Sequence, residues 1–259
     1  MKLGICYMVF DGEELLEFAA KAIRNKVDHI SVTYQTTSYF GNPSDPELPD
    51  LLDKLKSQGL IDEIIYYEPD LKIHHKLNEL RLRNIGLEAS RKANCTHHIS
   101  ADVDEFYNPE QLEFAKNAMK EDDYDFSVAP LTTYYKDPTY LIVPIQKLVV
   151  SFIHPVNNEY NMDILYPTFP FHMETTRRFT NHKKYRVFDI NEFTIHHMSY
   201  VRKDISKKLN NSDNGRFYKK REKFISDFNK YEVGDRVCIL PDFMNRKTIL
   251  VENTFGIQF

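Results

Sequence analysis

The sequence predicts an α/β protein whose first ~110 residues form a doubly wound, mainly parallel sheet. Three observations support this class. Short apolar runs of strand length alternate with longer segments of helical period. The first run, residues 3–10 (LGICYMVF), is apolar almost throughout, as is typical of a parallel strand covered on both faces. A later run ends in acidic residues, and ligands of such sheets bind where the parallel strands end.

Each element of this half follows from a local pattern. Asp11-Gly12 breaks the first run, and apolar residues at helical spacing from Leu15 to Ile23 predict the helix after it. Gly59 suits the end of the second helix, because glycine tolerates the left-handed conformation found there. In chain order, we expect a strand at 3–10, a helix at 13–25, a strand at 28–34, a helix at 51–58, a strand at 61–67, a helix at 74–93 and a strand that leads into Asp102.

The second half of the chain has a less regular pattern. The expected segments are a helix at 111–120, a strand at 124–133, an apolar stretch at 141–153, a loop at 157–178 that is rich in proline and aromatic residues, and a strand at 193–200.

Composition fits a globular protein of one large or two small domains. The chain has 259 residues, of which 42% are hydrophobic and 28% charged. No apolar run approaches the length of a membrane span, and Met1-Lys2 leads into a strand pattern instead of a signal peptide. The three cysteines are far apart in the sequence, which favours a reducing compartment over a disulfide framework. We therefore expect a cytoplasmic protein without a membrane span.

Residues 94–108 (NCTHHISADVDEFYN) carry the most specific chemical signal. A short strand ends in Asp102, Asp104 and Glu105. On a regular strand Asp102 and Asp104 point to the same side and can converge on one ion. Carboxylate oxygens suit Mg²⁺ or Mn²⁺, which often complete their shell with substrate phosphates. The alternative is an acidic strand exit that faces water.

Three segments in this order, CYMVFDGEELLEFA, VDHISVTYQ and RLRNIGLEASRKANCTHHISADVDEFY, resemble glycosyltransferases of the GT-A fold, of the broad family-2-like kind with a D-x-D-E-F motif. The resemblance covers residues 3–115, with a weaker match at 195–209. It implies a GT-A-like doubly wound, mainly parallel sheet flanked by helices, with a C-terminal helical and basic extension. Residues 1–200 would form the nucleotide-sugar-binding and catalytic domain, and residues 201–259 an extension packed on it.

The resemblance also implies an activity. It predicts a metal-dependent glycosyltransferase that moves a sugar from a nucleotide-sugar donor, usually a UDP-sugar, to an acceptor hydroxyl. Mn²⁺ or Mg²⁺ would bridge the donor diphosphate to the protein. The residues implied in nucleotide binding are Tyr7, Met8, Val9, Gln35, Arg83 and Asp102. Gln35 stands where many relatives carry an acid that contacts the base, so the choice of base stays open. Tyr7 as a core residue and Arg83 as a solvated helix residue are the alternatives.

A third metal ligand is implied by IHHMSYVRKDISKKL, which resembles a histidine-containing segment of some of these enzymes. His196 and His197 point to opposite faces of a strand, so only one of them can enter the site. The resemblance favours His197, with His196 as the competitor. The implied metal ligands are Asp102, Asp104 and His197, with Asp104 as the direct ligand and Asp102 reaching the ribose or a metal-bound water.

An acceptor pocket with a catalytic carboxylate is expected within residues 157–178. The candidates there are Glu159, Asp163 and Glu174, and the sequence does not select among them.

Charge is unevenly distributed along the chain. Residues 177–223, which we call the basic segment, hold 14 Lys and Arg against 5 Asp and Glu, whereas the whole chain has a net charge of −4. A basic segment beside an acidic site favours a negatively charged partner. This partner would be the donor diphosphate, an anionic acceptor or nucleic acid; a solvated basic helix is the alternative. A second functional hypothesis is therefore a nucleic-acid-directed protein, either a sugar transferase acting on modified DNA bases or a non-catalytic binder.

Overall fold

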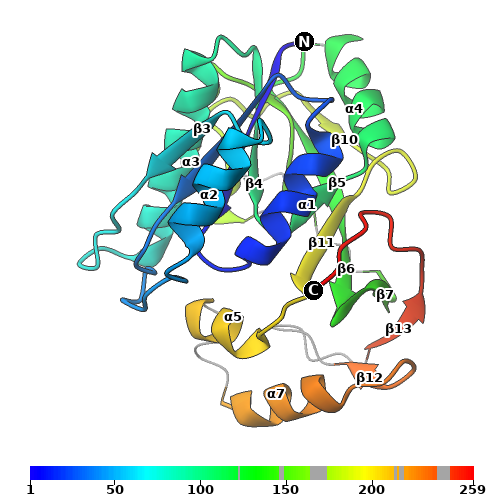
Figure 1. The fold of residues 1–259 in the computed structure, drawn as a ribbon. Helices are drawn as coiled ribbons and strands as arrows, with labels where there is room; N and C mark the ends of the chain where they lie inside the picture. Colours follow the sequence, from blue (N-terminus) through cyan, green and yellow to red (C-terminus); the bar gives the residue numbers. More distant parts are fainter. Residues whose placement is uncertain (122, 146–148, 164–173, 213–214, 216–218, 238–245) are drawn as a thin grey trace.

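The structure is a computed structural model of the chain. It describes all residues except 122, 146–148, 164–173, 213–214, 216–218 and 238–245 (Figure 1). Within the described residues, no helix is both long and apolar enough to cross a membrane.

A five-stranded sheet with the order β3-β2-β1-β4-β9 forms the N-terminal half. Its first four strands pair in parallel, which confirms the predicted doubly wound α/β arrangement, and β9 joins the edge in the antiparallel direction. The strands are β1 (Leu3–Val9), β2 (His29–Tyr34), β3 (Glu63–Tyr66), β4 (His97–Asp102) and β9 (His154–Pro155). Because β1 lies at the centre, its end and the ends of β2 and β4 meet at one edge of the sheet.

Helices cover both faces of this sheet. The residues of β1 alternate between them: Cys6 faces α3 (His75–Lys92) through Gly86, whereas the Tyr7 hydroxyl lies 3.5 Å from the Ala19 carbonyl of α1 (Glu13–Ile23). A Cβ atom on Gly86 would lie 2.5 Å from Cys6, so only glycine allows α3 to approach the strand this closely. Helix α2 (Leu48–Ser57) completes the N-terminal half and begins three residues earlier than its predicted start at 51.

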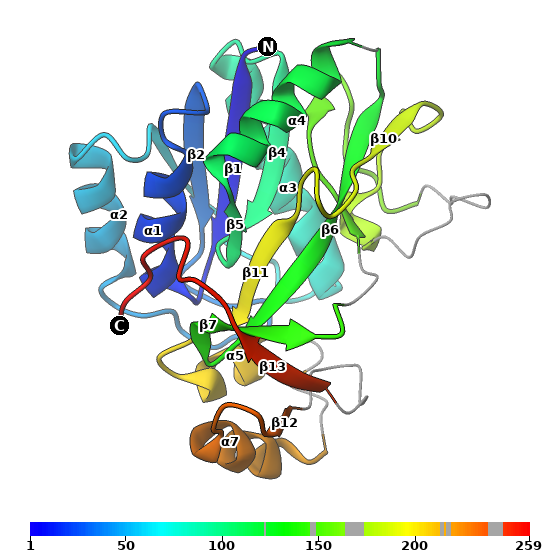
Figure 2. The ribbon, with the colours of Figure 1, turned by 90° about the vertical axis from the view of Figure 1, so that its right-hand side faces the viewer.

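A second, mixed sheet of eight strands is centred on β6 (Phe126–Tyr135) and β11 (Ile195–Tyr200), which run in parallel side by side (Figure 2). The other strands are β5 (Glu105–Tyr107), β7 (Asp137–Val143), β8 (Val149–Ser151), β10 (Tyr185–Val187), β12 (Arg236–Val237) and β13 (Arg246–Leu250). Since β4 belongs to the first sheet and β5 to the second, the acidic segment between them lies where the two sheets meet.

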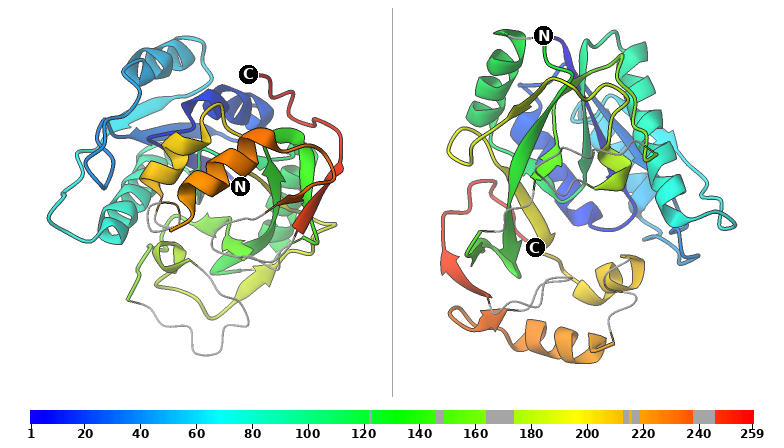
Figure 3. Two further views of the ribbon diagram at one scale, coloured as in Figure 1. Left: turned by 90° about the horizontal axis from the view of Figure 1, so that it is seen from below. Right: turned by 180° about the vertical axis from the view of Figure 1, so that it is seen from behind.

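The C-terminal part contributes helices below the strand ends (Figures 1 and 3). Helices α5 (Ile205–Asn211) and α7 (Arg221–Lys230) bury a small apolar cluster against the second sheet. Its members include Tyr135, Ile142, Tyr200, Leu209, Phe224 and Phe228. Strand β13 pairs with β7, so this part shares a sheet with preceding residues, and a domain boundary at residue 200 stays a prediction. The remaining helices are α4 (Pro109–Glu121) and the 3₁₀ helix η1 (Thr175–Arg177).

Candidate active site

A cavity of about 630 Å³ opens at the carboxyl ends of β1, β2 and β4. Its volume lies within the range typical of small-molecule sites. Met8 and Gln35 line it from the first two strands, Asp102 and Asp104 from the segment after β4, and Lys208 from α5. The predicted location of a ligand site in such a sheet therefore coincides with a cavity.

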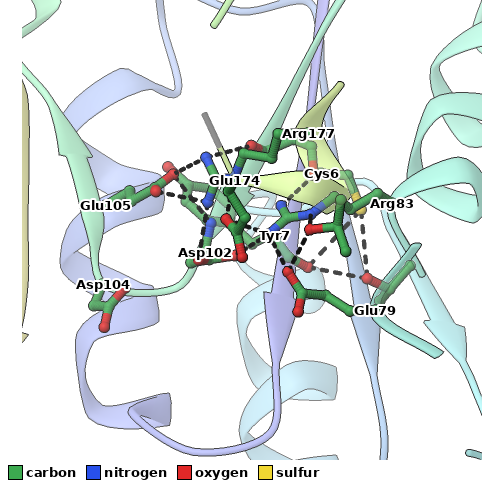
Figure 4. Close-up of polar contacts among 12 residues, drawn as sticks. Cys6, Tyr7, Glu79, Arg83, Asp102, Asp104, Glu105, Glu174 and Arg177 are labelled. Atoms are coloured by element: carbon green, nitrogen blue, oxygen red, sulfur yellow. Dashed lines mark hydrogen bonds and ion pairs between the residues drawn. The ribbon is translucent and has the colours of Figure 1, made fainter. Parts of the chain in front are cut away.

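Asp102 stands at the end of β4 between two guanidinium groups (Figure 4). Its Oδ1 atom lies 3.3 Å from Nη2 of Arg83, and its Oδ2 atom accepts a hydrogen bond of 2.8 Å from Nη2 of Arg177. The Asp102 side chain keeps 36% of its surface exposed, whereas both arginine side chains are almost fully buried. The arginines thus contact Asp102 from the protein interior, and the exposed side of the Asp102 carboxylate faces the cavity.

Arg177 also holds Glu105, the third acid of the motif. Its Nη1 and Nη2 atoms donate hydrogen bonds of 3.1 and 2.7 Å to the two carboxylate oxygens of Glu105, which is buried. Burial raises the pKa of Glu105, and the paired Arg177 opposes that rise. A two-point guanidinium–carboxylate pair of this kind fixes the direction of both side chains. It therefore locks η1 against the strand that carries the acids.

Arg83 is anchored by Glu79, one turn earlier on α3. The Glu79 Oε1 atom accepts hydrogen bonds of 2.8 Å from Arg83 and 2.6 Å from Thr176. Burial acts to raise the pKa of Glu79, but Arg83 and Lys76 outweigh it and lower that pKa to about 2. Glu79 is therefore an ionised anchor within the site.

Asp104 points away from the Asp102–Arg177 cluster and has its own cations (Figure 4). Its Oδ2 atom accepts hydrogen bonds of 2.7 Å from Nη2 of Arg202 and 2.8 Å from Nζ of Lys208. Burial acts to raise the pKa of Asp104, but Lys208 and Arg202 hold it well below its usual range. These cations come from residues 202 and 208, so the part of the chain after β11 completes the site.

The residues expected at the nucleotide divide into two groups. Met8, Val9 and Gln35 line the cavity. Gln35 is 3% exposed, and its Oε1 atom has no hydrogen-bond partner among the described residues. Tyr7 is instead a core residue that faces α1, since neighbouring residues of a strand point to opposite sides. Arg83 is fully buried behind Asp102, so it contacts the acids and does not wall the cavity.

The two adjacent histidines of β11 point in different directions, as the strand pattern predicts. The His197 Nε2 atom lies 3.7 Å from Oδ1 of Asp104, whereas His196 hydrogen-bonds to the Tyr134 hydroxyl at 2.7 Å. Burial lowers the pKa of His197, and the neighbouring Asp104 opposes this effect. His197 is thus the histidine that reaches the acidic motif.

Of the three candidate catalytic carboxylates, only Glu174 lines the cavity. It forms ion pairs with Lys76 at 3.0 Å and with Nε of Arg177 at 3.2 Å. Glu159 is exposed and lies 3.4 Å from Arg91, and Asp163 is also exposed; neither lines the cavity. Glu174 is therefore the candidate that lies at the cavity, and its catalytic role stays a prediction.

The expected Mn²⁺ or Mg²⁺ can be weighed against this arrangement. Both Asp102 oxygens face arginines, and the Asp104 oxygens face Arg202, Lys208 and His197. Within the part of the chain that the structure describes, no three His, Cys, Asp or Glu side chains are placed to hold a metal ion together. The residues as arranged do not fit a divalent ion, because protein cations occupy the positions it would take. Metal binding stays a prediction from the sequence.

Sequence reasoning missed the cations and one acid that complete the cluster. These residues are Lys76, Glu79, Arg177, Arg202 and Lys208. One signal pointed to three of them, because Arg177, Arg202 and Lys208 belong to the basic segment. The individual contacts of these three residues could not be predicted, because they join positions that are 72 to 104 residues apart in the chain.

No protein-family model matches the chain, and no curated protein matches it. Among solved structures, residues 1–349 of S. aureus TarS are 14% identical over 82% of this chain, with a TM-score of 0.48. The same protein in complex with UDP is 13% identical over 82% of this chain, with a TM-score of 0.47. A longer TarS structure is 11% identical over 87% of this chain, with a TM-score of 0.46. The chain spans 66%, 67% and 42% of these three chains, respectively. At such values the likeness carries no argument about function, which must come from the site.

Replacing Arg177 should destabilise the protein strongly. Arg177→Met leaves the buried Glu105 without its cation, and breaking a buried ion pair in this way typically costs about 3–5 kcal/mol. Urea unfolding measures the loss. The control is Lys21→Met, which removes an exposed helix pair with Glu17 and should cost less than about 1 kcal/mol. Equal losses in the two variants would contradict this account of the cluster.

Glu79 should make stability depend on pH in a defined direction. Its folded pKa of about 2 lies below the value of about 4.3 for an unfolded glutamate, so folding favours its ionised form. This contribution is fully present above about pH 4.3 and is lost as the pH falls toward about 2. The free-energy gap between wild type and Glu79→Gln, measured by urea unfolding, should therefore shrink between about pH 6 and about pH 3. A gap that is independent of pH would show that the ionised form is not what stabilises the fold.

Proposed function

We propose that this chain is a glycosyltransferase that moves a sugar from a nucleotide-sugar donor, most simply a UDP-sugar, to an acceptor hydroxyl. One observation carries this proposal: a single cavity combines a buried amide oxygen that has no partner among the described residues with a cluster of ion-paired acids and bases. Gln35 directly follows β2 and Asp102 ends β4, the two strands that flank β1, so the two residues lie on opposite sides of the central strand at the same edge of the sheet. This arrangement suits a ligand that has a base at one end and a diphosphate at the other.

The Gln35 end of the cavity is suited to a nucleobase. Tyr39 and Phe40 line it together with Met8, and aromatic rings of this kind can stack on a flat heterocycle. An amide offers both a donor and an acceptor, so it can pair with the edge of a base. A buried acceptor without a partner is costly, and a base N–H would remove that cost.

The other end is suited to a leaving diphosphate. Sugar transfer breaks the bond between sugar and phosphate, and negative charge develops on the departing nucleoside diphosphate. Lys208 and Arg202 lie in the cavity wall next to Asp104 and can stabilise that charge. The acceptor hydroxyl loses a proton in the same transfer, and Glu174 is the carboxylate at the cavity that can orient or accept it.

The nucleic-acid hypothesis gains no comparable support. Arg177, Arg202 and Lys208 of the basic segment point toward the acids of the cavity and do not form an outward phosphate-binding surface. A nucleic-acid acceptor stays a prediction, as do the sugar and the base.

Calorimetry with UDP, GDP, CDP and ADP tests donor binding, and a screen of the corresponding nucleotide sugars for release of nucleoside diphosphate tests turnover. UDP is the first choice because of the sequence resemblance. Failure of every nucleotide and nucleotide sugar would overturn the proposed function.

Removing the Gln35 amide should weaken nucleotide binding without harming the fold. Gln35→Met keeps a side chain of similar length and removes one or two neutral hydrogen bonds, so the dissociation constant for UDP should rise by about 3–10-fold. The melting temperature should not fall, because the amide oxygen has no partner to lose among the residues that the structure describes. Unchanged affinity for all four nucleotides would remove Gln35 from the site.

Glu174 should affect transfer more than donor binding. Glu174→Gln removes the carboxylate charge but keeps the size of the side chain, and loss of a general base typically slows transfer by about 100-fold or more. UDP affinity should stay within about threefold, because Lys76 and Arg177 keep other acidic partners. Exposed Glu159 provides the matched control: Glu159→Gln should leave both quantities unchanged. Full transfer activity in Glu174→Gln would exclude Glu174 as the base.

A further inference from the structure

We infer that Arg202 and Lys208 supply the positive charge that binds the donor diphosphate, so that donor binding does not require a divalent cation. This inference rests on the proposed function and deepens it. It departs from what the sequence resemblance implies, where Mn²⁺ or Mg²⁺ bridges the diphosphate to the acidic motif.

Arg202 has hydrogen-bond donors to spare. A guanidinium carries five N–H donors, and Arg202 directs its Nη2 atom at Asp104 at 2.7 Å. Its Nε and Nη1 atoms are buried and have no hydrogen-bond partner among the described residues. Buried donors without partners cost free energy, particularly on a charged group. A phosphate oxygen that enters beside Arg202 would supply the missing acceptor once the side chain turns one of these donors toward the cavity.

The position of Arg202 is fixed by the turn after β1. Its guanidinium packs on Gly12, where a Cβ atom would lie 2.2 Å from Nη1 of Arg202. Gly12 also has a φ of +79°, which glycine adopts without strain. Arg202 is therefore held against the backbone at the end of the central strand, and Asp104 holds it on the other side. Both contacts orient the group before any ligand arrives.

Lys208 has spare donors as well. Its ammonium group makes one hydrogen bond of 2.8 Å to Asp104, and its side chain keeps 19% of its surface exposed. The neighbouring Lys207 differs, because it turns to Glu13 at 2.6 Å and Asp45 at 3.8 Å. Arg202 and Lys208 line both the cavity of about 630 Å³ and an adjoining one of about 770 Å³, so an anion between them would be reachable from either side.

A divalent ion would have to displace these groups. The charged side chains that contact one another here are five acids, Glu79, Asp102, Asp104, Glu105 and Glu174, and five bases, Lys76, Arg83, Arg177, Arg202 and Lys208. Their formal charges already balance. A divalent ion bound to Asp104 would be repelled by Arg202 and Lys208, which already donate hydrogen bonds to that carboxylate. A diphosphate can instead accept hydrogen bonds from the remaining donors of both residues while they keep their bonds to Asp104.

The experiment compares UDP binding by calorimetry in EDTA and in Mn²⁺, for wild type, Lys208→Gln and Lys207→Gln. We expect wild type to bind UDP equally in both conditions, within about threefold. Lys208→Gln should bind at least about tenfold more weakly in EDTA, because it loses a hydrogen bond to a charged group. Lys207→Gln, which removes the same charge one residue away, should match wild type. Lys208→Arg should recover most of the affinity.

Inorganic pyrophosphate is the second probe, since it carries the charge without the nucleoside. If the wild type loses binding of UDP and pyrophosphate in EDTA and regains it with Mn²⁺, the inference is overturned but the proposed function stands. Pyrophosphate that binds in EDTA through Lys208, with no nucleotide bound in any condition, overturns the proposed function but leaves the anion site. If Lys208→Gln does not fold, the wild-type comparison between EDTA and Mn²⁺ still decides.

Discussion

The requirement that buried carboxylates be met by cations organises this structure around its cavity. Asp104 and Glu105 are 4% and 2% exposed, and neither would be stable as an isolated charge. Arg177 reaches Glu105 from η1, and Arg202 and Lys208 reach Asp104 from the segment after β11. Pairing the acids therefore draws together segments that are distant in the sequence. This pairing leaves room for the cavity, because Arg177, Arg202 and Lys208 come from segments beside the first sheet and do not cover the ends of β1, β2 and β4.

Helix α3 shows how one short motif serves both packing and the site. Arg83 turns toward the acids, and Asn84 next to it exchanges two hydrogen bonds with the backbone of Tyr160, at 3.1 and 3.2 Å. Gly86 faces β1 and lets the helix approach Cys6. The three residues point in different directions because successive helical positions differ by about 100°. Each position therefore needs its own residue type: a guanidinium for the acids, an amide for the backbone of Tyr160, and no side chain against β1.

Local pattern was enough to predict some of this arrangement. The alternation of strands and helices gave the parallel sheet, and strand periodicity placed His196 and His197 on opposite sides. The same periodicity accounts for Tyr7, which shares the α1-facing side of β1 with other odd-numbered residues. The partners of Asp102 and Asp104 could not be predicted, because charge pairing over many tens of residues leaves no periodic trace in a sequence. A carboxylate gives no sign in the sequence of which lysine or arginine will meet it, and only the fold shows which of these side chains arrive.

The two acids of the motif differ in how completely their cations are used. Around Asp102, both terminal nitrogens of Arg177 donate hydrogen bonds to carboxylate oxygens, and its Nε atom lies 3.2 Å from Oε2 of Glu174 without a hydrogen bond, so this side has little donor capacity left for a ligand and serves to hold the fold. Around Asp104, Arg202 and Lys208 each use one donor and retain others. A cation whose donors are mostly used contributes to stability, whereas an oriented cation with donors to spare can take up new negative charge with little reorganisation, which is the condition for strong electrostatic stabilisation of a reaction. By this physical criterion the site divides between its two aspartates: the protein is held together at Asp102 and is prepared for an anion at Asp104.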